Sequence, residues 1–443
     1  MGLKYIEHVK SIFLALLIVL SVTLTFTIWT YTPTYDSIES TPVVDVLIAD
    51  SKRIDDVIKP YKMITSRENK MTGSMEPFDL NRVVNVMKNW KMSELSLEDT
   101  DLTEDELNEL ISTHHRYTLF FPDDVPFRVY DNILPFSITN IPEAGFDRLI
   151  VNWNRTDNEQ MKVYFASSKT NTLYSAIAKD VEWKLFEQKV VSPTMEFSEF
   201  TEIQRSGRLS LYVSAIDVES IQYTYYLKEI DPKRFQDALF SDTNLVRQSP
   251  VGTINEEYSD GTSLMIVNLL ERTLGFVNPS AETTLPAEPS KLLFDSLDYI
   301  NEHGGWTDEF RFSKINPTNQ QIDYQLYLLG YPVFSTETST KITTFWGDPG
   351  IYNYLRPYYT LDLSLPFDTV ISTLPSGEKA SRVMQLVKEI DFNNVDELTP
   401  GYYLTRDDEK SLLILEPSWF YLSNNQWIRL SPKDLGGGQS GLE

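Results

Sequence analysis

The stretch SIFLALLIVLSVTLTFTIWTY, residues 11–31, contains no charged side chain. As an α-helix it reaches roughly 31 Å at about 1.5 Å per residue, which matches the hydrocarbon thickness of a bilayer. Lys4 and Lys10 precede the stretch, whereas Asp36 and Glu39 follow it. Because the more positively charged flank of a transmembrane helix usually remains in the cytoplasm, this arrangement favours a cytoplasmic N-terminus. The sequence therefore predicts one membrane-spanning helix, with every later domain on the extracytoplasmic side.

A cleaved signal peptide is the alternative interpretation of the same stretch. The apolar run exceeds the about 7 to 15 residues of a signal-peptide core, and no A-x-A-like cleavage site follows it. Trp29, Tyr31 and Tyr35 cluster where the helix is expected to leave the bilayer, as aromatic rings do at a headgroup boundary. We therefore expect a retained anchor and a single-pass protein of the cell membrane.

Composition limits the chemistry of the exported part. None of the 443 residues is cysteine, which excludes disulfides, thiolate catalysis and cysteine-ligated metals. With 41% hydrophobic and 12% aromatic residues, the chain can build packed cores. The formal net charge of −25 argues against nucleic-acid binding, because phosphate contacts require clustered Lys and Arg. The acidity fits solubility outside the cell, and the alternative is a surface for a basic partner or polyvalent cations.

Hydrophobic periodicity predicts an α+β protein with three extracytoplasmic domains behind the anchor. Helical spacing between Phe78 and Trp90, and a capping box at Thr103 and Glu106, predict a helix-rich first domain. Alternating apolar residues indicate strands farther on, and the Pro-rich run at 279–289 suits a linker. The predicted parts are a cytoplasmic N-terminus (1–10), the transmembrane helix (11–31), a tether with the start of the ectodomain (32–60), the first domain (61–143), the second (144–285), the third (286–435) and a flexible tail (436–443).

Two pairs of segments suggest that the second and third domains share one architecture. The segment from Tyr223 to Pro232 resembles the one starting at Tyr358, and in both a strand is predicted to run into a helix start. Likewise, SLMIV at Ser263 resembles SLLIL at Ser411. The two offsets differ by thirteen residues, so an insertion must separate the copies. Chance similarity between Tyr-rich and Leu-rich strands is the alternative.

Histidines are too few for His-based catalysis or a metal site. His114 and His115 are adjacent, so they point to different faces, and no HExxH or HxH spacing occurs. They are better interpreted as residues at a helix end. His303 precedes Gly304 and Gly305, a pattern that predicts a helix stop. We therefore predict no metal ligand and no cofactor.

Carboxylates are the other candidates for catalysis, and a cell-wall hydrolase would need two of them facing each other across a cleft. Asp123, Glu256 and Asp407 lie in acidic groups with turn-like surroundings, where solvated loops are the simpler interpretation. No nucleophile motif or phosphate-binding loop is present. We therefore predict a protein without catalytic residues, with hydrolysis as the competing hypothesis.

Aromatic residues interleaved with glycine and arginine could form a contact surface on the ectodomain. The candidates are Tyr331, Trp346, Tyr352, Tyr354 and Arg356. A packed β-hairpin with Gly and Pro turns is the alternative for the same run.

Hydroxyl side chains in the predicted anchor could face a partner helix, because small residues allow close helix approach. The candidates are Ser21, Thr23, Thr25, Thr27 and Thr30. Alternatively, each hydroxyl bonds the carbonyl four residues earlier in its own helix.

Several segments taken in order resemble one known family. They are Val9–Ile12, Leu24–Trp29, the His303-Gly304-Gly305 turn, and the Gly-Tyr-Pro and Trp-Gly runs at 330–332 and 346–347. Their order and spacing resemble the YycH family of Gram-positive bacteria over essentially the full length. That family comprises extracytoplasmic regulators of the essential sensor histidine kinase YycG, also called WalK.

The resemblance implies a single-span protein whose second and third domains are similar to each other and to the companion protein YycI. It also implies that the transmembrane helix pairs with those of YycI and the kinase, and it supplies no catalytic residue. The expected function is non-enzymatic regulation of the kinase, and so of cell-wall metabolism. The alternative is an exported sensor that binds a cell-wall ligand between the second and third domains, with Trp346–Arg356 lining the groove.

Overall fold

The computed structural model describes residues 13–25, 48–67, 70–154, 160–283, 285–362, 364–365, 370–431 and 435. The chain forms two compact units, Met1–Val43 and Val44–Glu443. Residues 13–25 of the first unit are helical. Within the described ranges, no helix has both the length and the apolar character needed to cross a bilayer. The predicted span at 11–31 and the predicted tail at 436–443 extend into residues outside these ranges, and both stay predictions.

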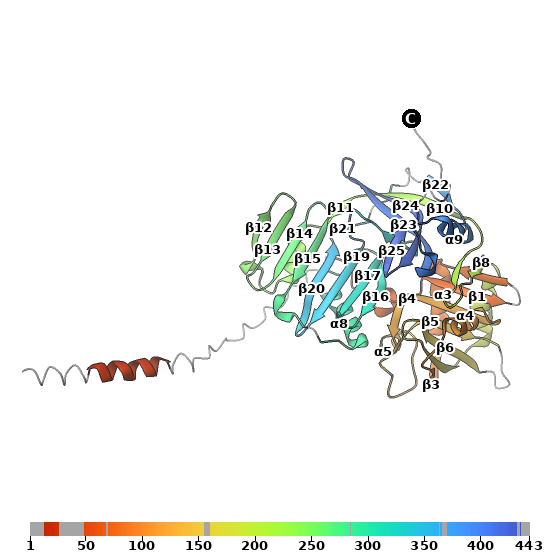
Figure 1. Cartoon of the computed structure of the whole chain (residues 1–443), viewed down its shortest axis with the longest axis horizontal. Helices are drawn as coiled ribbons and strands as arrows, with labels where there is room; N and C mark the ends of the chain where they lie inside the picture. The colour runs from red at the N-terminus through yellow and green to blue at the C-terminus, as the bar shows by residue number, and fades with distance from the viewer. Residues whose placement is uncertain are drawn as a thin grey trace, which may run out of the picture. The chain divides into compact units, whose positions relative to one another are not determined.

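The first sheet of the larger unit has nine strands in the order β3-β7-β6-β5-β4-β1-β2-β8-β9. Figure 1 labels several of them, among them β1, β4, β5 and β6. All of its pairings are antiparallel. The strands are β1 (Lys62–Arg67), β2 (Lys70–Ser74), β3 (Lys91–Asp99), β4 (Arg116–Pro126), β5 (Gly145–Asn152), β6 (Met161–Ser167), β7 (Thr172–Lys179), β8 (Ser198–Ile203) and β9 (Leu211–Ser214). The helices in this part of the chain are α2 (Ile54–Val57), α3 (Pro77–Met87), α4 (Glu104–Ser112), α5 (Phe127–Tyr130) and α6 (Trp183–Phe186).

The helix signals in this part of the sequence are confirmed. Thr103 caps α4, and its hydroxyl accepts from the amide of Glu106 at 3.3 Å, while the Glu106 carboxylate accepts from the amide of Thr103 at 2.9 Å. In α3, Leu80 and Val83 are buried as their spacing requires. Phe78 instead stays 75% exposed. It is the second residue of α3, and the Arg82 guanidinium lies over its ring at 5.3 Å.

The second sheet has fourteen strands, whose main path is β12-β13-β14-β15-β20-β19-β17-β18-β23-β24-β10-β22, with β16 on β17 and β25 on β24. Only the β18–β23 pair is parallel among the described strands of this sheet. The strands are β10 (Val218–Tyr226), β12 (Arg247–Val251), β13 (Asn255–Ser259), β14 (Leu264–Asn268), β15 (Thr273–Val277), β16 (Phe310–Asn316), β17 (Gln321–Leu328), β18 (Tyr331–Phe334), β19 (Lys341–Gly347), β20 (Gly350–Pro357), β22 (Val370–Leu374), β23 (Val395–Asp407), β24 (Leu412–Ser423) and β25 (Gln426–Arg429). The helices are α7 (Pro232–Leu239), α8 (Pro289–Glu302) and α9 (Gly377–Leu386).

The two predicted repeat copies lie in the second part of the chain, and two of their strands pair with each other. Short strands β11 (Lys228–Glu229) and β21 (Tyr359–Thr360) form a separate antiparallel pair. In the first copy, Asp231 caps α7 as predicted, accepting from the amide of Lys233 at 3.0 Å. In the second, β22 intervenes and α9 begins only at Gly377, behind its own cap Ser376. Both helices lead through a 3₁₀ turn, Thr243–Leu245 or Phe392–Asn394, into antiparallel strands.

One hydrophobic core continues from the nine-stranded sheet to the fourteen-stranded sheet, with Phe146 and Tyr324 as members from either side. The predicted domain boundary at 143/144 falls between the paired strands β4 and β5. The boundary at 285/286 falls just before α8. The α+β class is confirmed, whereas the division into three domains stays a prediction.

Candidate functional site

A cavity of about 470 Å³ lies at the junction of the two sheets. Phe121, Asp147, Arg148 and Lys169 line it from the nine-stranded side, as do Arg205 and Arg208. From the fourteen-stranded side come Lys314, Tyr327, Phe334, Lys341, Glu397 and Trp427. The strands of both sheets therefore have to be assembled before the cavity exists.

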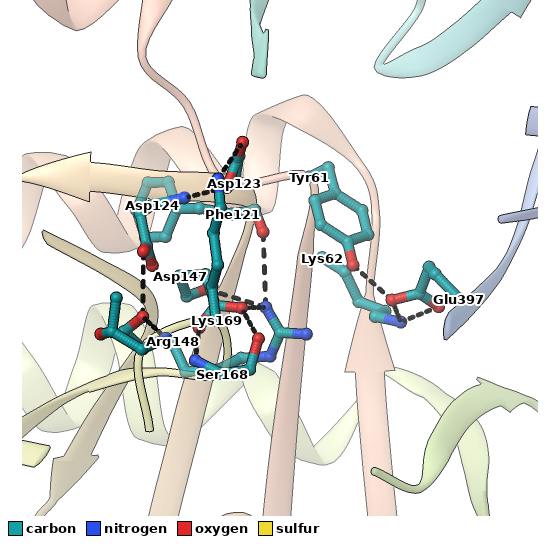
Figure 2. A network of polar contacts seen from close by, with 12 residues as sticks. Tyr61, Lys62, Phe121, Asp123, Asp124, Asp147, Arg148, Ser168, Lys169 and Glu397 are labelled. Atoms are coloured by element: carbon teal, nitrogen blue, oxygen red, sulfur yellow. Dashed lines mark hydrogen bonds and ion pairs between the residues drawn. The ribbon is translucent and has the colours of Figure 1, made fainter. Parts of the chain in front are cut away.

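A buried ion pair crosses the junction at one wall of the cavity (Figure 2). The Lys62 ammonium, which is 2% exposed, lies 3.0 Å from Oε1 of Glu397. The Tyr61 hydroxyl donates to the same carboxylate, and the amide of Leu398 donates to it at 2.9 Å. Lys62 also donates to the carbonyl oxygen of Tyr212 at 3.1 Å. Both charges therefore have partners that compensate for the loss of water.

The pKa values of this pair reflect burial and pairing together. Burial acts to raise the pKa of Glu397, but Lys62, the Tyr61 hydroxyl and Arg148 outweigh it, so the pKa of Glu397 lies below its usual value. For Lys62, burial lowers the pKa more than Glu397 raises it. The carboxylate is thus held in its charged form at neutral pH.

Arg148 belongs to a second polar cluster beside the ion pair, which Figure 2 shows around Asp147 and Ser168. Its guanidinium lies 3.1 Å from the Asp147 carboxylate, and it stacks over the Phe120 ring at 4.5 Å. Asp147 also accepts from the backbone amide of Ser168 at 3.0 Å and from the Ser168 hydroxyl. Both oxygens of the Asp147 carboxylate therefore have partners within the protein.

Asp124, next to this cluster, carries a strongly shifted carboxyl group. Burial, and secondarily the charge of Asp147, raise its pKa to about 7. The Ser167 hydroxyl donates to one of its oxygens at 2.9 Å. Asp124 thus changes charge near neutral pH in the wall next to the cavity.

Two further contacts cross the junction at the cavity rim. The Asp123 carboxylate accepts from the amide of Ile315 at 2.9 Å, and Lys169 donates to the Ile315 carbonyl at 3.1 Å. The two side chains also pair with each other at 3.2 Å. Elsewhere, Arg205 donates to the carbonyl oxygens of Phe392, at 3.3 Å, and Val395.

Residues 48–52 are hydrogen-bonded to the end of α8 and to the turn that follows it. We call this contact the 48–52 clasp. The amide of Ala49 donates to the carbonyl of Gly304 at 3.1 Å, and the amide of Trp306 donates to the carbonyl of Asp50 at 3.1 Å. Lys52 and Asn301 exchange two hydrogen bonds of 2.9 Å. Segment and helix end therefore bind each other mainly through backbone groups.

Gly305 is required for this close approach. Its φ is +68°, and a Cβ at this position would lie 2.2 Å from the carbonyl oxygen of Ala49. The predicted helix stop is confirmed, since α8 ends at Glu302 with His303 as its C-cap. The His303 ring stacks on Tyr299, in accord with the capping interpretation.

The candidate contact surface separates into half-buried and buried residues. Tyr331, Trp346 and Tyr352 are half-buried. Tyr354 and Arg356 are 0% and 1% exposed, so the exposed surface expected from the sequence does not include them. Arg356 donates to the carbonyl of Gly305 at 3.1 Å and to the Tyr354 hydroxyl at 2.8 Å. Strands β19 and β20 pair around Gly347 and Gly350, which is the packed hairpin of the alternative interpretation.

The three candidate carboxylates have separate structural partners. Asp123 binds Ile315 and Lys169, Glu256 accepts from the Tyr258 hydroxyl at 2.9 Å, and Asp407 pairs with Lys410 at 3.3 Å. Of the three, Asp123 alone is among the residues that line the cavity. Across the described part of the chain, no group of three or more His, Asp or Glu residues has metal-binding geometry.

In the N-terminal helix, two of the candidate hydroxyls bond within their own helix. Thr23 donates to the carbonyl of Val19 at 2.7 Å, and Thr25 donates to that of Ser21 at 2.8 Å. Thr27 and Thr30 lie outside the described residues. A partner-facing role for these side chains stays a prediction.

Sequence reasoning missed Tyr61, Lys62 and Glu397. Lys62 and Glu397 are 335 residues apart in the chain, and neither belongs to a recognisable motif. No local signal was available, because β1 reads KMITSR and its mostly polar composition does not indicate that Lys62 is buried.

Comparison with known proteins gives concordant matches over nearly the whole chain. The model of the YycH protein N-terminal domain matches residues 7–188, and that of the C-terminal domain matches residues 209–434. The two-component system WalR/WalK regulatory protein YycH of Bacillus subtilis (strain 168) is 21% identical over 458 residues, covering 99% of each chain. The crystal structure of YycH from Bacillus subtilis has the same fold, with a TM-score of 0.75 at 17% identity over 87% of this chain and 99% of that one.

Proposed function

The chain belongs to the YycH family, and from this premise we propose that it is a membrane-anchored, non-enzymatic regulator of the sensor histidine kinase WalK (YycG). The Bacillus subtilis relative is named as a WalR/WalK regulatory protein, which supports a regulatory role. We place the N-terminus in the cytoplasm, one helix in the cell membrane and the C-terminal domains outside. The proposed partners are the kinase and YycI, and the proposed output is cell-wall metabolism.

The 48–52 clasp is the observation that carries this proposal. Residues 48–52 are the first described residues after the predicted anchor, and they are bonded to the end of α8. A displacement of α8 would therefore move residues 48–52 with it, and we propose that this movement reaches the anchor. In our proposal the anchor helix then biases a two-state kinase, for which a coupling free energy of about 1 to 3 kcal/mol is typical.

The anchor contact is tested by replacing the threonine face. Thr23→Leu, Thr27→Leu and Thr30→Leu in one protein should reduce co-purification with the kinase from detergent-solubilised membranes at least fivefold, because close helix packing is lost. The matched control combines Leu14→Ile and Ile18→Leu, which at about 100° per residue lie opposite Thr23. The control should leave co-purification unchanged.

Two outcomes would contradict the proposal. Unchanged association of the triple variant would remove this helix face from the mechanism. Recovery of the mature protein from the culture medium, without residues 11–31, would exclude membrane anchoring itself.

A second candidate function is ligand sensing by the exported part. The groove first expected at Trp346–Arg356 is a poor candidate, because Tyr354 and Arg356 belong to the core. The cavity between the two sheets is a better one.

A further inference from the structure

We propose that the cavity at the junction of the two sheets binds a small anionic sugar, a saccharide ring that carries a carboxylate or a phosphate. This inference goes beyond kinase regulation, and the binding can be measured without the kinase. It rests on the size of the cavity, on the charges that are left unpaired around it and on its aromatic wall.

The size and place of the cavity are those of a ligand site. Small-molecule sites usually measure about 300 to 1,000 Å³ and form preferentially between domains. The cavity measures about 470 Å³, and both sheets contribute to its wall. A monosaccharide with a charged substituent fits this volume.

The buried carboxylates of the wall already have protein partners. Asp147 is bound by Arg148 and Ser168, and Glu397 is bound by Lys62 and Tyr61. Asp123, in turn, is bound by Lys169 and by the amide of Ile315. The other two carboxylates in the lining, Glu104 and Asp396, are exposed to water. The buried acidic groups therefore leave little unbalanced negative charge for a ligand to meet.

Several cations of the same wall are not paired in this way. Within the described ranges, no carboxylate lies within ion-pair distance of Arg205, Arg208 or Lys314, although the charge of Asp396 acts on both arginines from farther away. Among the described residues, Arg205 donates to the carbonyl oxygens of Leu209, Phe392 and Val395, and Arg208 donates to the Asn394 amide oxygen at 3.4 Å. Lys341, by contrast, forms an ion pair with Asp323 at 3.7 Å. In a chain with a net charge of −25, this wall presents cations to a ligand, and Arg or Lys suits a carboxylate or a phosphate.

Aromatic rings complete the wall from the fourteen-stranded side. Phe334 and the half-buried Trp427 lie 5.4 Å apart, with their ring planes inclined by 35°. Tyr327 lines the same cavity. An aromatic face next to cations suits a molecule with an apolar ring face and an acidic group, which describes an anionic sugar. Because Arg208 and Lys314 come from opposite sides of the junction, a bound sugar would also stabilise the joined arrangement.

The experiment is calorimetric titration of the full-length protein in detergent micelles. The probes are N-acetylmuramic acid for the carboxylate, glucose 6-phosphate for the phosphate, and neutral N-acetylglucosamine as the ring without charge. We expect saturable binding of at least one charged sugar and at least tenfold weaker binding of the neutral one. Which charged sugar binds more tightly identifies the acidic group.

Variants connect any binding to this cavity. Lys314→Ala and Arg208→Ala should each weaken binding of the charged sugar at least tenfold, with little change in the melting temperature of the free protein, since in the described part of the chain neither side chain lies within ion-pair distance of a carboxylate. Lys184→Ala, at an exposed position outside the cavity lining, is the matched control and should bind normally.

Three results would overturn the proposal. The first is no binding of either charged sugar, and the second is equal binding of the neutral sugar. The third is binding that Lys314→Ala and Arg208→Ala leave unchanged. Failure of kinase association would not affect any of these measurements, so the two proposals can fail separately.

Discussion

Two of the contacts that hold the larger unit together use different chemistry. At the junction of the sheets, Lys62 and Glu397 form a buried ion pair from opposite sides. At the end of α8, the 48–52 clasp uses mainly backbone groups and depends on the missing side chain of Gly305. The ion pair requires two charges that compensate each other, whereas the clasp requires only space and hydrogen-bond geometry. Removing one member should therefore have different consequences at the two places.

The largest effect is expected at the ion pair. Glu397→Ala leaves the Lys62 ammonium buried without its partner, which typically costs about 3 to 5 kcal/mol. The free energy of unfolding, from denaturant titration of the full-length protein in micelles, should fall by that amount. A loss below about 1 kcal/mol would show that the junction relaxes and that the pair contributes little.

The pH dependence of the ion pair provides an internal control for this variant. The folded-state pKa of Glu397 is lowered, so its stabilisation is fully present above the usual value of 4.5 and is lost as the pH falls through the folded-state pKa. The stability difference between the wild type and Glu397→Ala should shrink in acid accordingly.

A smaller effect is expected at the clasp. Gly305→Ala places a Cβ 2.2 Å from the Ala49 carbonyl oxygen at a φ of +68°. The left-handed backbone alone costs about 1 to 2 kcal/mol. Gly252→Ala is the matched control, with a φ of +70° and nothing within 4 Å of its Cβ. Unfolding should show a loss of about 2 to 3 kcal/mol for Gly305→Ala and about 1 to 2 kcal/mol for the control. Equal losses would mean that residues 48–52 shift to accommodate the added Cβ at no measurable cost in stability.

The smallest effect is expected at the rim pair of Lys169 and Asp123. These side chains are 52% and 13% exposed, so water competes with the contact. Lys169→Ala should change the free energy of unfolding by about 0 to 1 kcal/mol, as is usual for exposed pairs. A loss as large as that of Glu397→Ala would show that burial does not explain the different contributions of the two ion pairs to the free energy of unfolding.

Local signals in the sequence predicted local structure well. The capping box at Thr103, the N-cap at Asp231 and the helix stop before Gly304 all occur as expected. Each depends on hydrogen bonds or backbone conformation within a few residues, so the neighbouring sequence contains the necessary information. The aromatic run at Trp346–Arg356 was harder to interpret, because residue type alone does not decide which side of a strand faces the core.

The sequence by itself determined the helix caps, the α+β class and the family. These follow from residue types and short spacings. Only the tertiary structure decided that Lys62 meets Glu397, that residues 48–52 bind the end of α8 and that cations line a cavity between the sheets. The physical reason is that the effect of a buried charge or of a missing Cβ depends on residues hundreds of positions away in the chain. Only folding brings those residues into contact.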